Sequence, residues 1–94
     1  MQFMIVAYDG QDEGALNRRL AVRDSHIAGA IALKNAGNLI AGGAILDEAG
    51  RMIGSTTYVE FESRADLDNW LQQDPYVTGD VWRDITISLI RLTV

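Results

Sequence analysis

The chain contains a single histidine, His26, in a segment that also carries two arginines. At about 100° per residue, Arg19, Arg23 and His26 form one ridge of a predicted helix, because they are spaced by four and three residues. The ridge borders an apolar stripe that we expect to face the core. The stripe consists of Leu16, Leu20, Ile27 and Ile31. Charged groups beside a core are costly unless they are paired, so the ridge predicts a cleft with cationic walls.

Asp74 is the second residue that points to chemistry. It lies four residues after Trp70 and seven after Leu67, which places it on the buried face of the second predicted helix. A carboxylate beside an imidazole stabilises the imidazolium, fixes the tautomer and prepares the ring for proton transfer. Two alternatives remain open. Asp74 is also typical of a turn or cap before Pro75, and His26 is also typical of a packing or surface residue.

Composition excludes several classes of function. The formal net charge of −5 argues against a nucleic-acid partner, which requires a basic surface. One histidine and no cysteine argue against a metal site or a disulfide, and the lack of cysteine is compatible with a cytoplasmic location. No apolar run approaches about 18 residues, so we expect no membrane span. No glycine-rich nucleotide motif is present, and we expect no cofactor.

The apolar pattern predicts one domain, 1–94, with the element order β-α-β-β-α-β. The expected strands cover 1–8, 39–46, 53–61 and 81–94, and the expected helices cover 15–36 and 63–74. Gly37 ends the first helix and Gly50 marks a hairpin. Ser63 and Asp66 resemble a capping box at the second helix. This order predicts an α+β, ferredoxin-like fold, with two helices on one face of a four-stranded antiparallel sheet.

The first strand is apolar on both of its faces. Phe3, Ile5 and Ala7 alternate with an equally apolar set, namely Met4, Val6 and Tyr8. An uncovered sheet face of this kind would be a large exposed apolar patch. We therefore expect a homodimer in which two open sheet faces pack together. The alternative is that loops or crowded strand edges cover this face.

Other residues are candidates for the walls of the cleft. Gly42 and Gly43 favour either a bulge or a close approach of the backbone to a ligand. Ser55 is placed to line the cleft, although strand serines are often only compatible fillers. Tyr76 and Trp82 are placed to wall a pocket, although aromatic residues of this kind also serve as core or interface.

The chain resembles the YciI-like (YCII-related) family along essentially its whole length. The resemblance is carried by L-A-V-R-D-S-H at 20–26, A-G-G at 41–43, G-S-T at 54–56 and D-P-Y-V at 74–77. Two positions depart from the family pattern. Asp24 stands where members often have proline, which adds a charge near the predicted site, and Ala44 stands where members often have proline, which changes the cleft wall.

The resemblance implies a dimeric α+β barrel with a site centred on His26 and Asp74. Arg23, Gly43 and Ser55 are implied as neighbours. Similar proteins include a dehydrochlorinase of a chlorinated hydroxyquinol, muconolactone isomerases and cofactor-free monooxygenases, so the functional implication is by analogy.

We therefore expect a cytoplasmic, homodimeric enzyme or binder for a small anionic or phenolic metabolite. His26 is the expected acid–base and Asp74 its orienting partner. The expected substrate contacts are Arg23, Arg19, Gly43, Ser55 and Tyr76. A proton-transfer reaction such as elimination or isomerisation needs only these groups. The competing hypothesis is a non-catalytic ligand-binding or assembly module in which the His–Asp pair is structural.

Overall fold

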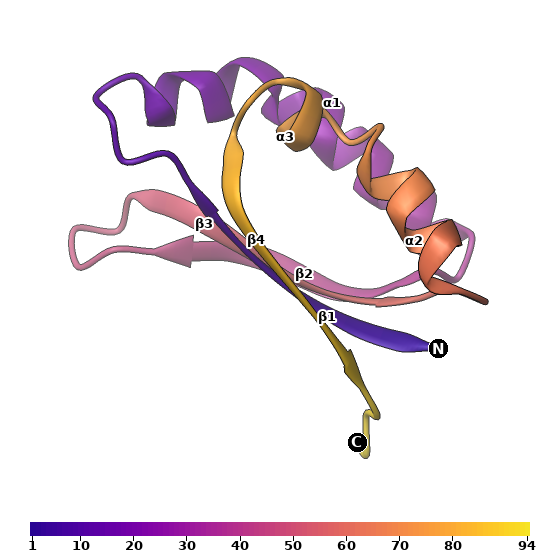
Figure 1. The fold of residues 1–94 in the computed structure, drawn as a ribbon. Helices are drawn as coiled ribbons and strands as arrows, with labels where there is room; N and C mark the ends of the chain where they lie inside the picture. Colours follow the sequence, from indigo (N-terminus) through magenta and orange to yellow (C-terminus); the bar gives the residue numbers. More distant parts are fainter.

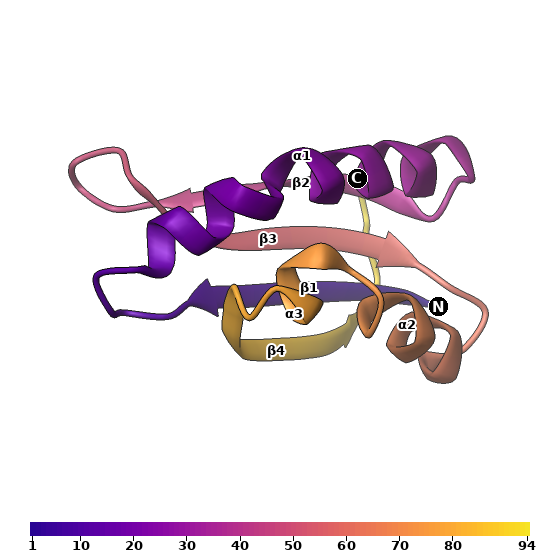
Figure 2. The same ribbon diagram turned by 90° about the horizontal axis from the view of Figure 1, so that it is seen from above.

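A four-stranded antiparallel sheet in the order β2-β3-β1-β4 carries every helix on one of its faces (Figure 1). The computed structural model describes all 94 residues. The elements are β1 (Gln2–Asp9), α1 (Ala15–Asn35), β2 (Leu39–Leu46), β3 (Met52–Glu60), α2 (Arg64–Leu71), α3 (Pro75–Thr78) and β4 (Trp82–Ile90). Figure 2 shows α1 over the β2–β3 side of the sheet and the two short helices over the β1–β4 side. The predicted α+β, ferredoxin-like order is confirmed.

Local signals fix the ends of the helices largely as the sequence predicts. Gly37 has a φ of 86° directly after α1, a conformation that glycine adopts without steric cost. The Ser63 hydroxyl accepts a hydrogen bond from the Asp66 amide at 3.1 Å and caps α2. One element was missed, since α2 ends at Leu71 and a separate turn of helix, α3, follows. Asp74 therefore caps α3 and does not lie on the buried face of α2.

The inner face of the sheet forms the core because the alternation of β1 places every second residue beneath the helices. Phe3, Ile5 and Ala7 are all buried. The core divides into two clusters along the sheet. One contains Phe3, Ile5, Val59 and Leu67, and the other contains Ala7, Tyr76, Val81 and Trp82. Two residues of the second cluster, Tyr76 and Trp82, also pack against His26 of the predicted site.

The apolar stripe predicted for the buried side of α1 faces solvent instead. Leu20, Ile27 and Ile31 are 50%, 39% and 55% exposed. The buried residues of α1 are Ala15, Arg19 and His26, which repeat at spacings of four and seven. This prediction was wrong because it assumed that the more apolar stripe is the buried one. The polar residues face inward because each finds a partner there, Arg19 at Asp9 of β1 and His26 at Asp74, the cap of α3.

No helix covers the outer face of the sheet (Figure 1). The β1 side chains on this face are apolar, whereas their β4 partners Ser88, Thr86 and Asp84 are polar. Met4 and Val6 are half-buried and Tyr8 is 44% exposed on this face. Across the strands they pair with Tyr58, Thr56 and Gly54. The irregularities of β2 lie between Leu39 and Ala41 and near its end, so the predicted glycine bulge at 42–43 is not present. No helix of the structure is long and apolar enough to cross a membrane.

Candidate active site

His26 and Asp74 meet although 48 residues separate them in the chain. His26 Nδ1 lies 2.8 Å from Asp74 Oδ2, and both side chains are largely buried. Because a carboxylate accepts, this contact favours the tautomer with its proton on Nδ1. Nε2 has no partner in the protein and is not fully enclosed. The imidazole thus presents one unoccupied nitrogen while the other is held by the carboxylate.

The position of Asp74 follows from its role as the cap of α3. Pro75 occupies the first turn of that helix, and Asp74 itself has an extended backbone, as expected before proline. Its Oδ2 atom also accepts a hydrogen bond from the Tyr76 amide at 3.0 Å. Asp74 therefore both caps α3 and binds His26, and it does so through the same oxygen atom.

The Tyr76 ring contacts both His26 and Arg19. Its centroid is 3.7 Å from that of the imidazole with an interplanar angle of 11°, and the Arg19 guanidinium carbon is 4.7 Å from the ring centre. His26 and Arg19 are seven residues apart on α1, or about two turns, which leaves room for one ring between them. Trp82 packs edge-on against both His26 and Tyr76. These contacts fix the orientation of the imidazole.

A buried ion pair forms the second part of the site. Arg19 Nη1 contacts both carboxylate oxygens of Asp9 at 3.0 and 3.1 Å, and Arg19 Nη2 donates to Ser55 Oγ at 2.8 Å. The side chains of Arg19 and Asp9 are each 3% exposed. The indole Nε1 of Trp82 donates to the same Ser55 oxygen at 3.2 Å. Both terminal nitrogens of Arg19 are therefore engaged by the protein, while Arg19 also lines the cavity and its buried Nε has no partner, so its role as a substrate contact stays a prediction.

A cavity of about 290 Å³ opens between α1 and the β2 edge of the sheet. Its lining comprises Arg19, Arg23, His26, Ile27, Ala30, Leu39, Gly42, Gly43, Ala44, Met52, Ser55, Thr57 and Tyr76. No acidic side chain is among them, although the whole chain carries a net charge of −5. Arg23 is exposed and forms no ion pair, so its charge is available to a ligand.

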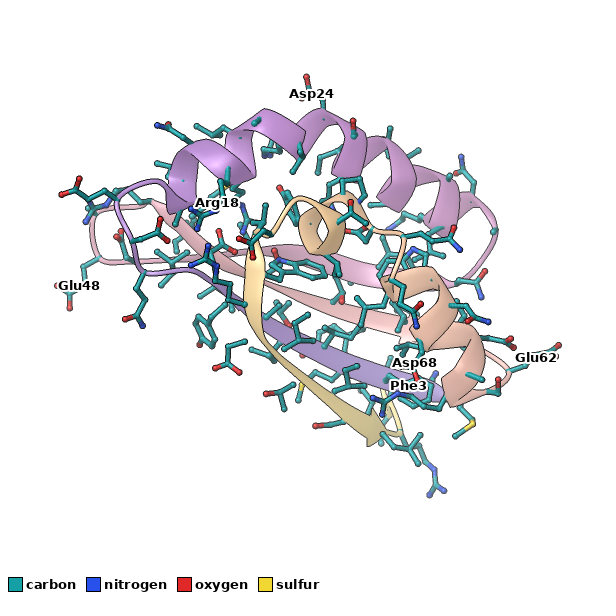
Figure 3. All side chains as sticks on the ribbon, turned by 45° about the horizontal axis from the view of Figure 1, so that its top comes forward. Phe3, Arg18, Asp24, Glu48, Glu62 and Asp68 are labelled. Carbon is teal, nitrogen blue, oxygen red and sulfur yellow. The ribbon has the colours of Figure 1, made fainter.

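Two further features of the sequence bear on the cavity. Gly42 faces inward, and an added Cβ would lie 2.9 Å from Thr57 Cγ2, so a side chain there would crowd the wall. Asp24 is exposed, does not line the cavity and points away from the sheet (Figure 3). The charge expected from Asp24 near the site is therefore directed into solvent.

The structure brings six predicted residues to one cavity and places Asp74 behind His26. The six are Arg19, Arg23, His26, Gly43, Ser55 and Tyr76. Sequence reasoning missed Asp9, and it named Trp82 only as a wall residue. The sequence could have indicated Asp9. It continues the alternation of Phe3, Ile5 and Ala7 along β1, so its side chain is expected to face inward.

Together, the fold and these contacts define a small ferredoxin-like α+β domain with a histidine–carboxylate pair at a cationic cavity. The model of the YCII-related domain matches residues 1–91. The chain belongs to the YCII-related family.

A curated relative supports this membership, and two solved structures share the fold. Protein YciI of Escherichia coli O6:H1 is 33% identical over 94 residues, which cover 94% of each chain. A 5-chloro-2-hydroxyhydroquinone dehydrochlorinase from Burkholderia phenoliruptrix AC1100, in complex with 2,5-dihydroxybenzoquinone, superposes with a TM-score of 0.84 at 23% identity, covering 97% of this chain and 94% of its own. A dimeric ferredoxin-like protein from an uncultured marine organism has a TM-score of 0.55 at 14% identity, with coverage of 99% and 97%.

Proposed function

We propose that this protein is an enzyme that transfers a proton on a small anionic or phenolic metabolite, in an elimination or isomerisation. The observation that carries the proposal is the His26–Asp74 contact at the wall of a cavity without acidic groups. His26 Nε2 is the acid–base atom, because Nδ1 is bonded to the carboxylate. Asp74 fixes the tautomer and stabilises the imidazolium when Nε2 accepts a proton.

The charge of the cavity supports an anionic ligand. Arg23 is an unpaired cation at the lining, whereas the charge of Arg19 is matched by Asp9. A carboxylate or phenolate placed beside Arg23 would gain a charge-assisted hydrogen bond. The apolar part of the lining, including Ile27, Leu39 and Met52, suits a flat carbon skeleton.

The Burkholderia dehydrochlorinase supports the same class of ligand. Its name describes loss of HCl from a chlorinated hydroxyquinol, and it was solved with a dihydroxybenzoquinone. We therefore choose 2,5-dihydroxybenzoquinone as the binding probe and 5-chloro-2-hydroxyhydroquinone as the first substrate to assay. Both compounds are compact and ring-shaped, and 2,5-dihydroxybenzoquinone is a vinylogous acid that meets Arg23 as an anion.

The test combines turnover with the tautomer of His26. We expect the wild type to release chloride from 5-chloro-2-hydroxyhydroquinone and His26→Gln to lose about 10²–10⁴-fold in kcat, the range for removing a general acid–base. Asp74→Asn should lower kcat and, in ¹⁵N–¹H NMR of the single imidazole, mix the tautomers. Asp68→Asn, which changes an exposed carboxylate on α2, is the matched control.

The competing ligand-binding hypothesis makes a different prediction. If the wild type binds 2,5-dihydroxybenzoquinone but neither releases chloride nor exchanges a carbon-bound proton of the bound probe with solvent, the catalytic proposal fails. The protein would then be a binding module in which His26 and Asp74 form a structural pair.

We also propose that the protein is a homodimer joined through the outer sheet face. The apolar side chains on that face and the absence of a covering helix support this assembly. The marine protein of similar fold is itself described as dimeric. A cytoplasmic location remains a prediction from the sequence.

A further inference from the structure

The Ser55 hydroxyl has one hydrogen-bonding valence that nothing in the protein uses. A serine oxygen accepts through two lone pairs and donates through one O–H bond. Both lone pairs are occupied, one by Arg19 Nη2 at 2.8 Å and the other by Trp82 Nε1 at 3.2 Å. No acceptor for the Ser55 proton lies within hydrogen-bonding distance, although the residue is only 5% exposed and lines the cavity.

We propose that Ser55 is a directed hydrogen-bond donor for a carbonyl, enolate or phenolate oxygen of the substrate. With both lone pairs engaged by donors, Ser55 presents only its proton to a ligand. This selects ligands that offer an oxygen acceptor at that point of the cavity and disfavours ligands that offer a donor. The inference rests on the function proposed above and names the group that the substrate must carry.

The ion pair behind Ser55 makes this donor rigid and strong. Arg19 is held on Asp9 by two contacts, so its second nitrogen is fixed toward Ser55. A hydroxyl that accepts from a guanidinium is polarised and donates more strongly, because hydrogen bonds in a chain reinforce one another. The low exposure of the pair keeps water from weakening the effect. Asp9 and Arg19 are thus positioning residues that act through Ser55.

The donor fits proton abstraction next to a carbonyl. His26 Nε2 takes a proton from a carbon adjacent to the C=O group, the C–H electron pair becomes the C=C bond of an enolate, and the carbonyl π pair moves to oxygen. Ser55 donates to that oxygen as its negative charge develops. In an elimination, the oxygen pair of the enolate re-forms C=O, the enolate C=C pair shifts to form a new C=C bond to the next carbon, and the leaving group departs from that carbon with its bonding pair. In an isomerisation, a carbon is reprotonated, and neither course needs an oxidant.

The test uses binding of substituted phenols whose oxygens differ in basicity. If Ser55 donates, the affinity of the phenolate form rises with the basicity of its oxygen, and 2,5-dihydroxybenzoquinone binds to the same cavity. Ser55→Ala should weaken phenolate binding about ten- to hundredfold, the range for one hydrogen bond to a charged group, and should flatten the dependence on basicity. Ser55→Cys keeps an acceptor for Arg19 and Trp82 but is a weak donor, so it tests the same loss if the alanine variant does not fold.

Ser63→Ala is the matched control, because it removes a serine hydroxyl that caps α2 and lies outside the cavity lining. It should keep the wild-type affinity and basicity dependence. Equal binding and equal dependence in the wild type and a folded Ser55 variant would overturn the donor and leave the proposed function standing. A wild type that binds neither phenolates nor 2,5-dihydroxybenzoquinone would overturn both.

Discussion

The Tyr76 ring lies almost parallel to the His26 imidazole, with centroids 3.7 Å apart. The guanidinium of Arg19 lies against the same ring. Because the faces of an aromatic ring are electron-rich, Tyr76 is favourably placed beside a permanent cation and a ring that becomes cationic when it accepts a proton. The stack therefore couples the packing of α3 to the charge state of His26.

Replacing Tyr76 tests whether its aromatic ring or its hydroxyl orients His26. Tyr76→Phe keeps the ring and should preserve the orientation of His26, whereas Tyr76→Leu should broaden the imidazole signals in ¹⁵N–¹H NMR. The leucine variant should also be less stable by about 0.5–1.5 kcal/mol beyond the change in buried area, the usual contribution of an aromatic pair. Urea unfolding measures the stability. Equal NMR spectra for the two variants would contradict an orienting role for the ring.

We expect the ionisation of the Tyr76 phenol to lower the free energy of unfolding at alkaline pH. Burial raises the pKa of the Tyr76 phenol above its ordinary value of 10.0, an effect that the charges of Arg19 and Arg23 oppose. Between the ordinary and the raised pKa, the unfolded chain binds fewer protons than the folded chain, so the free energy of unfolding falls as pH rises. The loss begins near pH 10 and is absent at neutral pH. Urea unfolding across this range should show a shallower fall for Tyr76→Phe; an unchanged slope would be inconsistent with this assignment.

Breaking the buried ion pair should be costly. Arg19→Met leaves Asp9 as an unpaired buried carboxylate, and Asp9→Asn leaves the charge of Arg19 unmatched. We expect each to lower the free energy of unfolding by about 3–5 kcal/mol, as for other buried pairs that lose one partner. The double variant Asp9→Asn, Arg19→Met should recover part of the loss, because no buried charge remains. Additive losses in the double variant would argue against coupling between the two residues.

The exposed stripe of α1 should tolerate polar residues. Leu20→Gln and Ile31→Gln change side chains that are 50% and 55% exposed, so we expect effects within about 0.5 kcal/mol. Leu67→Ala removes a fully buried side chain and should cost about 2–5 kcal/mol. Thermal or urea unfolding of the three variants measures the difference in stability loss between the exposed and the buried positions. A large loss for Leu20→Gln would show that this stripe is covered in solution.

A charge on the outer sheet face should separate the proposed dimer. Val6→Glu places a carboxylate between Met4 and Tyr8, where we expect the second copy to pack. Sedimentation or light scattering should then report a monomer, or a dimer that forms only at higher concentration. Ala28→Glu, on the exposed side of α1, is the control and should leave the mass unchanged. A wild type that is monomeric would refute the assembly.

The sequence was sufficient for the order of the main elements and for most of the residues that line the cavity, and its failure at α1 has a physical cause. Alternation in β1 and the signals at Gly37, Gly50 and Ser63 are local, so they predict elements without knowledge of their neighbours. Which face of α1 is buried cannot be predicted from the sequence of α1 alone. It depends on Asp9 and Asp74, which lie on other elements and neutralise the cost of burying Arg19 and His26. The separate turn of α3 was missed although its signals, the cap at Asp74 and Pro75 in the first turn, are local.

A single atom, Asp74 Oδ2, receives both the imidazole of His26 and the amide of Tyr76. A local opening that displaces Asp74 releases both the cap of α3 and the histidine, so we expect the His26–Asp74 pair and this helical turn to open and close together. Hydrogen exchange at the Tyr76 amide therefore reports how often the site disassembles. Ligands that bind His26 should slow hydrogen exchange at the Tyr76 amide, although they do not contact that amide.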